Sequence, residues 1–316
     1  MRVLRVACFV LVVIGVSWLV SCSQPTANMP SLPIITATPT EAPLASPTLA
    51  QPAAVPTDTP LQTPAAFPTD TQPSPIPPTI LPTPTVIPDS GWQLIATGRE
   101  ERTIHLFDER GRVEETIFIV RLDQTHYRFD VAYSPGEPKV LRDWQTETGA
   151  EIVVNGGFFD ENDQATGRII VNGQGFGTSY GDFAGMVAIN ENNTSLRWLG
   201  QRPYDPNEPL TAGLQSFPIL VKPGGQLGFP AEQESGRRAR RTVIAQDTSG
   251  RILLLVAPRG RFTLHELSLF LTDSDLELDI AINLDGGPSS GLLTSTPDQG
   301  YPPFVALPAV IAVYRR

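Results

Sequence analysis

A proline-rich stretch, Ser23–Pro88, most constrains what this chain of 316 residues can fold into. It holds 18 of the 32 prolines, with repeated Thr-Pro and Pro-Thr pairs. Proline has no backbone N–H and a fixed φ, so such a stretch favours extended polyproline II segments over helices and sheets. We therefore expect a semi-rigid tether or a disordered spacer at 22–90. A single folded domain is expected at 91–316, which is long enough to bury its own core.

The residues before the spacer have the pattern of an export signal. Arg2 and Arg5 precede an apolar run at 6–20, which is shorter than the ~20 residues that a membrane-spanning helix needs. The run ends in Leu-Val-Ser-Cys, which resembles the bacterial lipobox, in which the cysteine is lipidated. The sequence thus predicts a lipoprotein signal peptide at 1–21. It also predicts a protein that is exported and anchored through Cys22 to the outer face of the cell membrane.

Charge and cysteine content narrow the possible functions. The chain has 33 acidic and 23 basic residues, a net charge of −10, whereas a nucleic-acid-binding protein needs a broad basic footprint. Cys8 lies in the predicted signal and Cys22 in the predicted anchor, so no thiol is left for a disulfide or a zinc site. We expect no metal site and no cofactor, with a calcium or magnesium ion held by acids and carbonyls as the alternative.

Apolar, β-branched runs indicate a fold dominated by strands. Strands are expected at Trp92–Thr97, Arg102–Phe107, Glu114–Asp123, His126–Ser134, Glu151–Asn155, Arg168–Asn172, Met186–Asn190, Leu196–Leu199, Gly213–Val221, Val243–Gln246, Ile252–Ala257, Ile280–Leu284 and Ala309–Tyr314. One helix is expected at Val140–Thr148, and a second after Thr263, where Thr-x-x-Glu has the form of a capping box. We therefore expect a single α+β domain with a large mixed or antiparallel sheet and few helices.

Two of the expected strands end in the same unusual way. One ends in Asn155 and two glycines, and the other in Asp285 and two glycines. A buried strand seldom ends on a polar side chain unless that group is capped, paired or used, and glycines let the backbone approach a ligand closely. A local turn held by Asp285 is the alternative. The repetition of the pattern favours a functional site.

Three segments, in this order, resemble the phosphodiester glycosidase family: Asn-Gly-Gly-Phe-Phe at 155–159, Arg-Thr-Val-Ile at 241–244 and Asn-Leu-Asp-Gly-Gly at 283–287. The resemblance spans roughly 92–316. Three positions depart from the family pattern: Val243 in place of an alanine, Ala245 in place of a glycine and Pro288 in place of a third small residue. The resemblance implies the family's fold and an enzyme that cleaves a sugar-1-phosphodiester between the sugar C1 and the oxygen.

The resemblance also implies roles for individual residues. A departing phosphate monoester needs little protonation, since its second pKa is about 6, so one carboxylate and one guanidinium suffice. Asp285 would activate water or stabilise the oxocarbenium-like centre, Arg241 would hold the phosphate, and Asn155 would orient hydroxyls or water. The substrate-binding candidates are Gly156, Gly157, Phe158, Phe159, Asp160, Gln215, Ser216, Arg240, Gly286, Gly287, Ser289 and Ser290.

Residues that flank these candidates are expected to be structural. Neighbouring residues of a strand face opposite sides, so only one of Phe158 and Phe159 is expected to line the pocket. Arg237 and Arg238 are expected to form a solvated basic loop.

Two other functions are consistent with the sequence. A glycosidase acting on ordinary glycosidic links of cell-wall polysaccharide would need a second carboxylate, for which Asp160 is the candidate. A non-catalytic lipoprotein that binds surface carbohydrate would need no carboxylate chemistry. The expected partners are a carbohydrate or sugar-phosphate substrate and, through Cys22, the membrane, but not nucleic acid.

Overall fold

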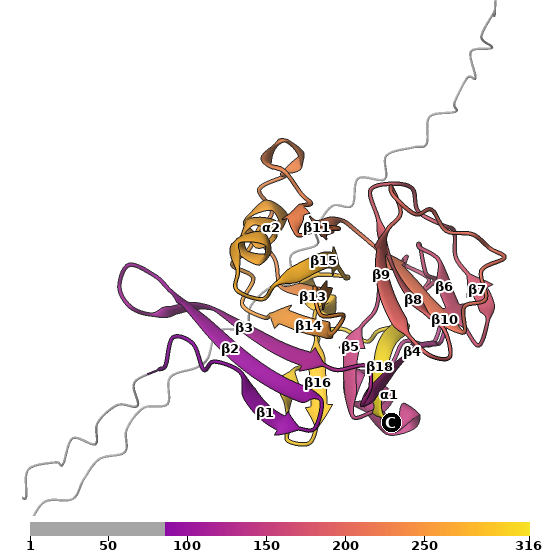
Figure 1. Cartoon of the computed structure of the whole chain (residues 1–316), viewed down its shortest axis with the longest axis horizontal. Coiled ribbons are helices and arrows are strands. Elements are labelled where there is room, and N and C mark those ends of the chain that lie inside the picture. The colour runs from indigo at the N-terminus through magenta and orange to yellow at the C-terminus, as the bar shows by residue number, and fades with distance from the viewer. Residues whose placement is uncertain (1–85) are drawn as a thin grey trace, which may run out of the picture. The chain divides into compact units, whose positions relative to one another are not determined.

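The computed structural model describes residues 86–316 (Figure 1). The predicted signal peptide, Cys22 and the predicted spacer up to residue 85 lie outside the described residues. Ordered contacts begin slightly before the expected boundary at 91: the N–H of His105 donates to the Pro88 carbonyl at 2.7 Å, and Asp89 pairs with Arg102 at 2.5 Å. In the described part of the chain, no helix is long and apolar enough to cross a membrane.

The described residues form an α+β fold in which strands far outnumber helices, as the sequence predicts. The helices are α1 (Leu141–Thr148) and α2 (Leu264–Asp273). The strands form three sheets, and every pair of neighbouring strands is antiparallel.

The largest sheet has eight strands, in the order β1 (Gln93–Ala96), β2 (Arg99–Phe107), β3 (Val113–Leu122), β14 (Ile252–Ala257), β13 (Arg241–Asp247), β15 (Leu278–Asn283), β11 (Ile219–Lys222) and β12 (Gln226–Leu227). The second sheet has the order β7 (Gln174–Phe176), β6 (Ile169–Val171), β10 (Ala212–Ser216), β8 (Gly185–Ile189) and β9 (Thr194–Trp198). The third has the order β17 (Asp298–Tyr301), β16 (Leu292–Ser295), β5 (Ile152–Asn155), β18 (Ala309–Arg315) and β4 (Tyr127–Tyr133).

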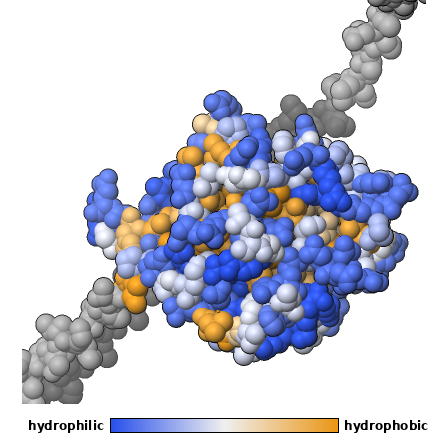
Figure 2. Space-filling model, viewed as in Figure 1, coloured by the Kyte–Doolittle hydropathy of each residue, from blue (hydrophilic) through white to orange (hydrophobic). Residues whose placement is uncertain are grey.

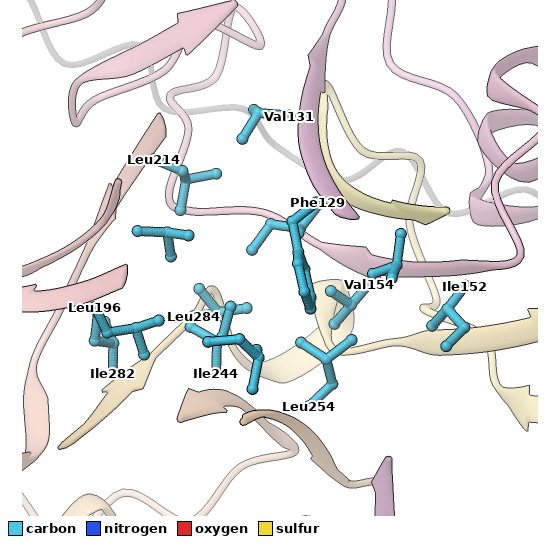
Figure 3. Close-up of a cluster of buried hydrophobic side chains, with 14 of the residues drawn as sticks. Phe129, Val131, Ile152, Val154, Leu196, Leu214, Ile244, Leu254, Ile282 and Leu284 are labelled. Atoms are coloured by element: carbon cyan, nitrogen blue, oxygen red, sulfur yellow. The ribbon is translucent and has the colours of Figure 1, made fainter. Parts of the chain in front are cut away.

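The main hydrophobic core lies where the three sheets meet. Figure 3 shows Ile244 of the first sheet, Leu214 of the second and Val154 of the third pointing into it, each 0 % exposed. Along β13 the side chains alternate, so that Val243 points to the opposite face of the first sheet, which α2 covers through Leu267. Because both faces of this sheet are buried, its central strands read as continuous apolar runs.

Both helices are located where the sequence predicts them. The capping box before α2 is confirmed: the Thr263 hydroxyl accepts from the N–H of Glu266 at 3.2 Å, and the Glu266 carboxylate accepts from the N–H of Thr263 at 3.0 Å. Helix α1 ends at Gly149, whose φ of 66° is the left-handed conformation that glycine adopts easily. The start of α2 and the end of α1 each depend on a few adjacent residues, so the sequence alone predicts them.

One expected strand is two strands in the structure. The run Gly213–Val221 was expected to be continuous, but β10 ends at Ser216, β11 begins at Ile219, and the two strands belong to different sheets. Pro218 lacks the N–H that a continuous ladder needs, so the pairing breaks there. The short strands β7, β12, β16 and β17 were not expected. The break directs Phe217 out of both sheets and toward the cavity described below.

The face of the molecule shown in Figure 2 is mostly polar. Hydrophilic residues cover most of the face shown in Figure 2, and hydrophobic ones gather in a band across its centre. The most exposed large apolar side chains are Phe304 (77 %), Leu94 (76 %) and Ile87 (68 %). Single exposed apolar residues are ordinary on a folded surface. Phe183 also belongs to this group, at 52 %.

Candidate active site

The register of the first sheet brings Arg241 and Asp285 together. Val243 and Asn283 are the last paired residues of the β13–β15 ladder, and one further main-chain hydrogen bond of 2.9 Å, between positions 242 and 284, continues it. Arg241 begins β13, and Asp285 follows the end of β15 by two residues, so both lie at the same edge of the sheet.

A cavity of about 490 Å³ opens at this edge of the sheet, a volume within the range of about 300–1,000 Å³ typical of small-molecule sites. It is lined by Phe158, Phe217, Pro218, Ser235, Arg237, Ala239, Arg241, Leu264, Asn283, Asp285, Gly286, Gly287, Pro288 and Ser289. Among these lining residues Asp285 is the only acid. Phe158 and Phe217 stack with their ring centroids 4.3 Å apart and form an aromatic wall.

Asp285 is a largely buried carboxyl. Burial raises its pKa from the ordinary 3.8 to about 6, and hydrogen bonds from the Ser289 side chain and the Gly286 N–H offset the shift only in part. A carboxyl whose pKa lies near neutral pH is suited to accept or donate a proton during a reaction. Asp285 and Ser289 are thus brought together at the cavity, as their sequence motif predicts.

Arg241 is a buried cation without an acidic partner. It is 8 % exposed, and its guanidinium donates to the main-chain oxygens of Arg237 at 2.7 Å and Phe262 at 3.3 Å. Burial lowers its pKa, and the charge of Glu234 offsets this shift only in part. Within residues 86–316 the guanidinium forms no ion pair with a carboxylate. A guanidinium held in this way is a site for an anion, because a bound anion would compensate its buried charge.

Asn155 does not reach the cavity, so the predicted role in orienting substrate is wrong. Its side chain is 0 % exposed. The amide NH₂ donates to the main-chain oxygens of Asp285 at 2.8 Å and Gly156 at 3.1 Å, and the amide oxygen accepts from the N–H of Gly291 at 3.0 Å. Every polar group of this amide is therefore used to hold the two glycine-containing strand ends against each other.

Gly156 and Gly157 also have a structural role, and the prediction that their amides line the pocket is wrong. Both are buried. A Cβ on Gly156 would lie 2.9 Å from the main-chain oxygen of Ala309, and one on Gly157 would lie 2.7 Å from that of Gln215. These residues must be glycine so that the end of β5 can fit between β18 and β10.

Gln215, Ser216 and Asp160 are not at the cavity either. The Gln215 side chain, 1 % exposed, accepts from the N–H of Tyr180 at 2.8 Å and so holds a neighbouring loop. Ser216 is fully buried. Asp160 is exposed, and its carboxylate accepts two main-chain N–H bonds of 2.9 Å from its own loop, which is the local turn chemistry typical of aspartate.

Arg240, Ser290 and Phe159 face away from the cavity. Arg240 follows the strand alternation: it lies on the opposite side from its neighbour and donates to the Pro302 carbonyl at 2.9 Å. Ser290 is 0 % exposed and does not line the cavity. Phe159 packs against the core of the third sheet, whereas Phe158 lines the cavity, an arrangement that matches the expectation that only one of the two does so.

Several lining residues were not identified from the sequence. Asn283 lies two positions before Asp285, and this period of two was the signal that should have revealed it. Its amide donates to the Phe217 carbonyl at 2.8 Å, and its buried amide oxygen has no partner among the described residues. Arg237 is exposed, as expected, but it also lines the cavity rim. Leu264, at the start of α2, also lines the cavity, and no local sequence pattern indicates this position.

The fold and the cavity define a class of protein: a strand-rich α+β domain with a buried carboxyl beside an unpaired guanidinium, suited to an anionic substrate. Residues 148–314 match the sequence profile of the phosphodiester glycosidase family. This match covers more than half of the chain, and the chain belongs to that family. Membership supports a glycosidase that acts on a phosphodiester-linked sugar. No curated protein sequence matches the chain significantly.

Solved structures share the fold. The catalytic domain of zebrafish N-acetylglucosamine-1-phosphodiester alpha-N-acetylglucosaminidase, auto-inhibited by its pro-peptide, matches 69 % of this chain and 83 % of its own, with a TM-score of 0.55 and 19 % identity. A hypothetical protein from Synechocystis matches 70 % of this chain and 62 % of its own, with a TM-score of 0.50 and 15 % identity. At these identities the likeness concerns the fold alone.

Proposed function

We propose that this protein hydrolyses a sugar-1-phosphodiester of a cell-surface or extracellular glycan at the bond between the sugar C1 and the phosphate oxygen. One observation carries the proposal: Arg241, at the start of β13, and Asp285, two residues after the end of β15, line one cavity, and no acid among the described residues forms an ion pair with the guanidinium. The guanidinium supplies a phosphate site, and the carboxyl supplies a proton acceptor.

The two side chains have different roles in the reaction. Asp285 accepts a proton from water as the water oxygen bonds to C1. The bond from C1 to the phosphate oxygen breaks, and its electron pair leaves with the phosphate. The products are the free sugar and a phosphate monoester that keeps the rest of the substrate. Arg241 stabilises the charge that develops on the departing phosphate, a preorganised contribution worth several kcal/mol in a water-poor site (about 3–4 for a single donor).

The composition of the cavity favours this reaction over hydrolysis of an ordinary glycosidic link. An alcohol leaving group needs a general acid in addition to the base or nucleophile, so ordinary glycosidases use two carboxylates about 5–10 Å apart. Among the lining residues Asp285 is the only acid, and Asp160 lies elsewhere. A phosphate monoester leaves without a general acid, which suits a site with one carboxyl and one guanidinium.

The test is an assay of the purified chain on a panel of sugar-1-phosphodiesters, with mass detection of the free sugar and the phosphate monoester. We expect Asp285→Asn to lower kcat/KM at least about 100-fold. Asp160→Asn makes the same chemical change outside the cavity and serves as its control. We expect Arg241→Ala to lower turnover of phosphodiesters, whereas Arg238→Ala, which removes an exposed ion pair with Glu266, keeps it.

Near-normal turnover in Asp285→Asn would exclude the carboxyl role, and full activity in Arg241→Ala would exclude the phosphate site. Saturable glycan binding with no product after long incubation would favour a binding protein instead.

We further propose that the chain is exported and lipidated at Cys22, on the basis of its lipobox and the short apolar run before it. Metabolic labelling with an alkyne fatty acid tests this. We expect the label to be lost in Cys22→Ala and kept in Cys8→Ala, since only the first removes the lipidated thiol. Label in both variants would refute lipidation at Cys22. Absence of label from the wild-type protein would refute lipidation of the chain altogether.

A further inference from the structure

Arg240 is a buried cation that the proposed reaction does not use. Its side chain is 8 % exposed, and within residues 86–316 it forms no ion pair with a carboxylate. Burial lowers the pKa of its guanidinium, and the charge of Glu115 offsets this shift only in part. Its Nε and Nη1 atoms have no hydrogen-bond partner among the described residues. A buried charge without a partner destabilises a folded protein, so packing alone does not explain an arginine at this position.

Arg240 contacts two segments next to Asp285. Its main-chain oxygen accepts from the N–H of Gly287 at 2.9 Å, which belongs to residues 285–289, called here the catalytic turn. Its Nη2 donates to the Pro302 carbonyl at 2.9 Å. The ring of Phe304 lies over the same guanidinium, with its centre 4.0 Å from the guanidinium carbon, a favourable cation–π contact. Arg240 therefore links the catalytic turn to residues 302–304, which we call the strap.

The strap also holds the catalytic turn directly. The N–H of Phe304 donates to the Pro288 carbonyl at 2.7 Å. Pro288 lines the cavity and is one of the positions at which this chain departs from the family pattern. Two successive residues of the turn, Gly287 and Pro288, are thus held by hydrogen bonds, one from Arg240 and one from the strap that Arg240 binds.

The catalytic turn carries the groups that stabilise the charge of Asp285. These are the Ser289 side chain and the Gly286 N–H. Hydrogen bonds weaken steeply when their geometry changes, and a displacement of about 1 Å at a reacting group can cost about 100-fold in rate. Because Arg241 follows Arg240 directly in β13, a hold on the turn at Arg240 fixes the distance between the carboxyl and the proposed phosphate site.

We propose that Arg240 is a positioning residue: together with the strap it fixes the catalytic turn, and through the turn the Asp285 carboxyl, relative to Arg241. Arg240 does not contact the substrate in this role. The inference rests on the proposed function, because it names what holds the two reacting side chains of the same site in place.

The test compares Arg240→Met with Arg197→Met. Arg197 on β9 is a matched control, because it is 6 % exposed, its Nη1 pairs with Glu208 at 2.7 Å, and its other two nitrogens have no partner among the described residues. Denaturant unfolding should show a loss of stability in both variants. We expect kcat on a sugar-1-phosphodiester to fall about tenfold or more in Arg240→Met with KM nearly unchanged, whereas Arg197→Met keeps both. Normal kcat in Arg240→Met, or an equal fall in both variants, would overturn the proposal.

A second pair of variants decides the question if Arg240→Met does not fold. Phe304→Ala removes a ring that is 77 % exposed, and Leu94→Ala removes an apolar side chain that is 76 % exposed and lies on β1. We expect Phe304→Ala to lower kcat about two- to fivefold, the size of an exposed cation–π contact, and Leu94→Ala to leave it unchanged. An unchanged kcat in Phe304→Ala would then refute the role of the strap.

Hydrogen exchange separates this inference from the proposed function, because it needs no substrate. The measured groups are the main-chain N–H groups of Gly287 and Phe304, followed by NMR. Faster exchange of both in Arg240→Met but not in Arg197→Met, in a protein that hydrolyses no phosphodiester, supports Arg240 as the residue that fixes the turn and refutes the proposed function. Hydrolysis with normal kcat and unchanged exchange in Arg240→Met does the reverse.

Discussion

Asp285 is the residue on which most of the site's chemistry depends. Its carboxyl is buried and has only the Ser289 side chain and the Gly286 N–H to stabilise its charge. Burial without full compensation is what keeps its pKa near 6, so the group is mostly ionised at neutral pH and accepts a proton easily. The cost of this arrangement is a carboxylate that destabilises the folded state.

The first prediction concerns the pH dependence of activity. If Asp285 is the proton acceptor, kcat/KM should fall about tenfold per pH unit below a pKa of about 6 and level off above it. Stopped assays between pH 4.5 and 8 measure this profile. A profile that instead falls above pH 6 would show that the protonated carboxyl is the active form, and Asp285 would then be a general acid.

The second prediction concerns stability. A carboxyl pKa raised from 3.8 to about 6 means that the folded state binds more protons than the unfolded state between these pH values, so stability decreases as pH rises through that window. The side chain of Asp285→Asn does not ionise, so the variant does not lose stability in this way as pH rises. We expect the variant to be more stable than wild type by about 2–3 kcal/mol at pH 7.5, and the advantage to vanish near pH 3.5. Urea unfolding at both pH values measures it, and an equal difference at both would contradict the linkage.

Residue chemistry was partly predictable from the sequence. The motif around Asp285 identified the carboxyl and Ser289 because their positions are local. Asn155 was misassigned, since nothing in its motif reveals that its amide turns into the protein rather than toward a ligand. Asn283 was missed although it lies two positions from Asp285 on the same strand.

At the scale of elements, the ends of β5 and β15 form one unit. Asn155 at the end of β5 donates to the carbonyl of Asp285, and the N–H of Asp285 donates to the carbonyl of Gly156 at 3.1 Å. The catalytic strand end is therefore held by the other glycine-containing strand end. The similarity of the two sequences reflects this mutual support, not two halves of a ligand site.

The third prediction tests this unit. Asn155→Ala leaves the Asp285 carbonyl and the Gly291 N–H without their partner, which should cost about 2–4 kcal/mol of stability. Because Asp285 loses a hydrogen bond that fixes its backbone, kcat should fall more than KM rises. Asn193→Ala, at an exposed position, is the control. A stable variant with normal kcat would show that the contact does not position the carboxyl.

Elements with local signals were predictable, and elements formed by long-range pairing were not. The capping box of α2 and the glycine stop of α1 depend on a few adjacent residues. Strand β16 pairs with β17 and with β5, which is far away in the sequence, and the short segments of β16 and β17 carry no clear pattern. The pairing of β13 with β15, which brings Arg241 and Asp285 to one cavity, is also long-range, because β14 and α2 lie between these strands in the chain.

At the scale of the whole molecule, the first and third sheets are joined by polar contacts as well as by the core. Arg99 on β2 is 0 % exposed and pairs with Glu101 at 2.5 Å within the first sheet. Its other nitrogen donates to Glu151 at 2.7 Å and to the carbonyl of Thr296 at 2.9 Å, next to strands of the third sheet. The sequence did not indicate this link, since an arginine in a strand usually points to solvent.

The fourth prediction follows from this link. Arg99→Met leaves the buried Glu101 without its cation, and breaking a buried pair in this way costs about 3–5 kcal/mol. Arg112→Met is the control, because the Arg112 side chain is 71 % exposed and its ion pair with Asp108 should contribute at most about 1 kcal/mol.

A double variant separates the loss of the pair from the loss of a charge. Combining Arg99→Met with Glu101→Leu removes the unpaired acid and should recover part of the stability, because apolar replacement of a whole buried pair is often neutral. Denaturant unfolding of the two single variants and the double variant provides the comparison. If Arg99→Met costs no more than Arg112→Met, the buried arginine does not contribute to joining the first and third sheets.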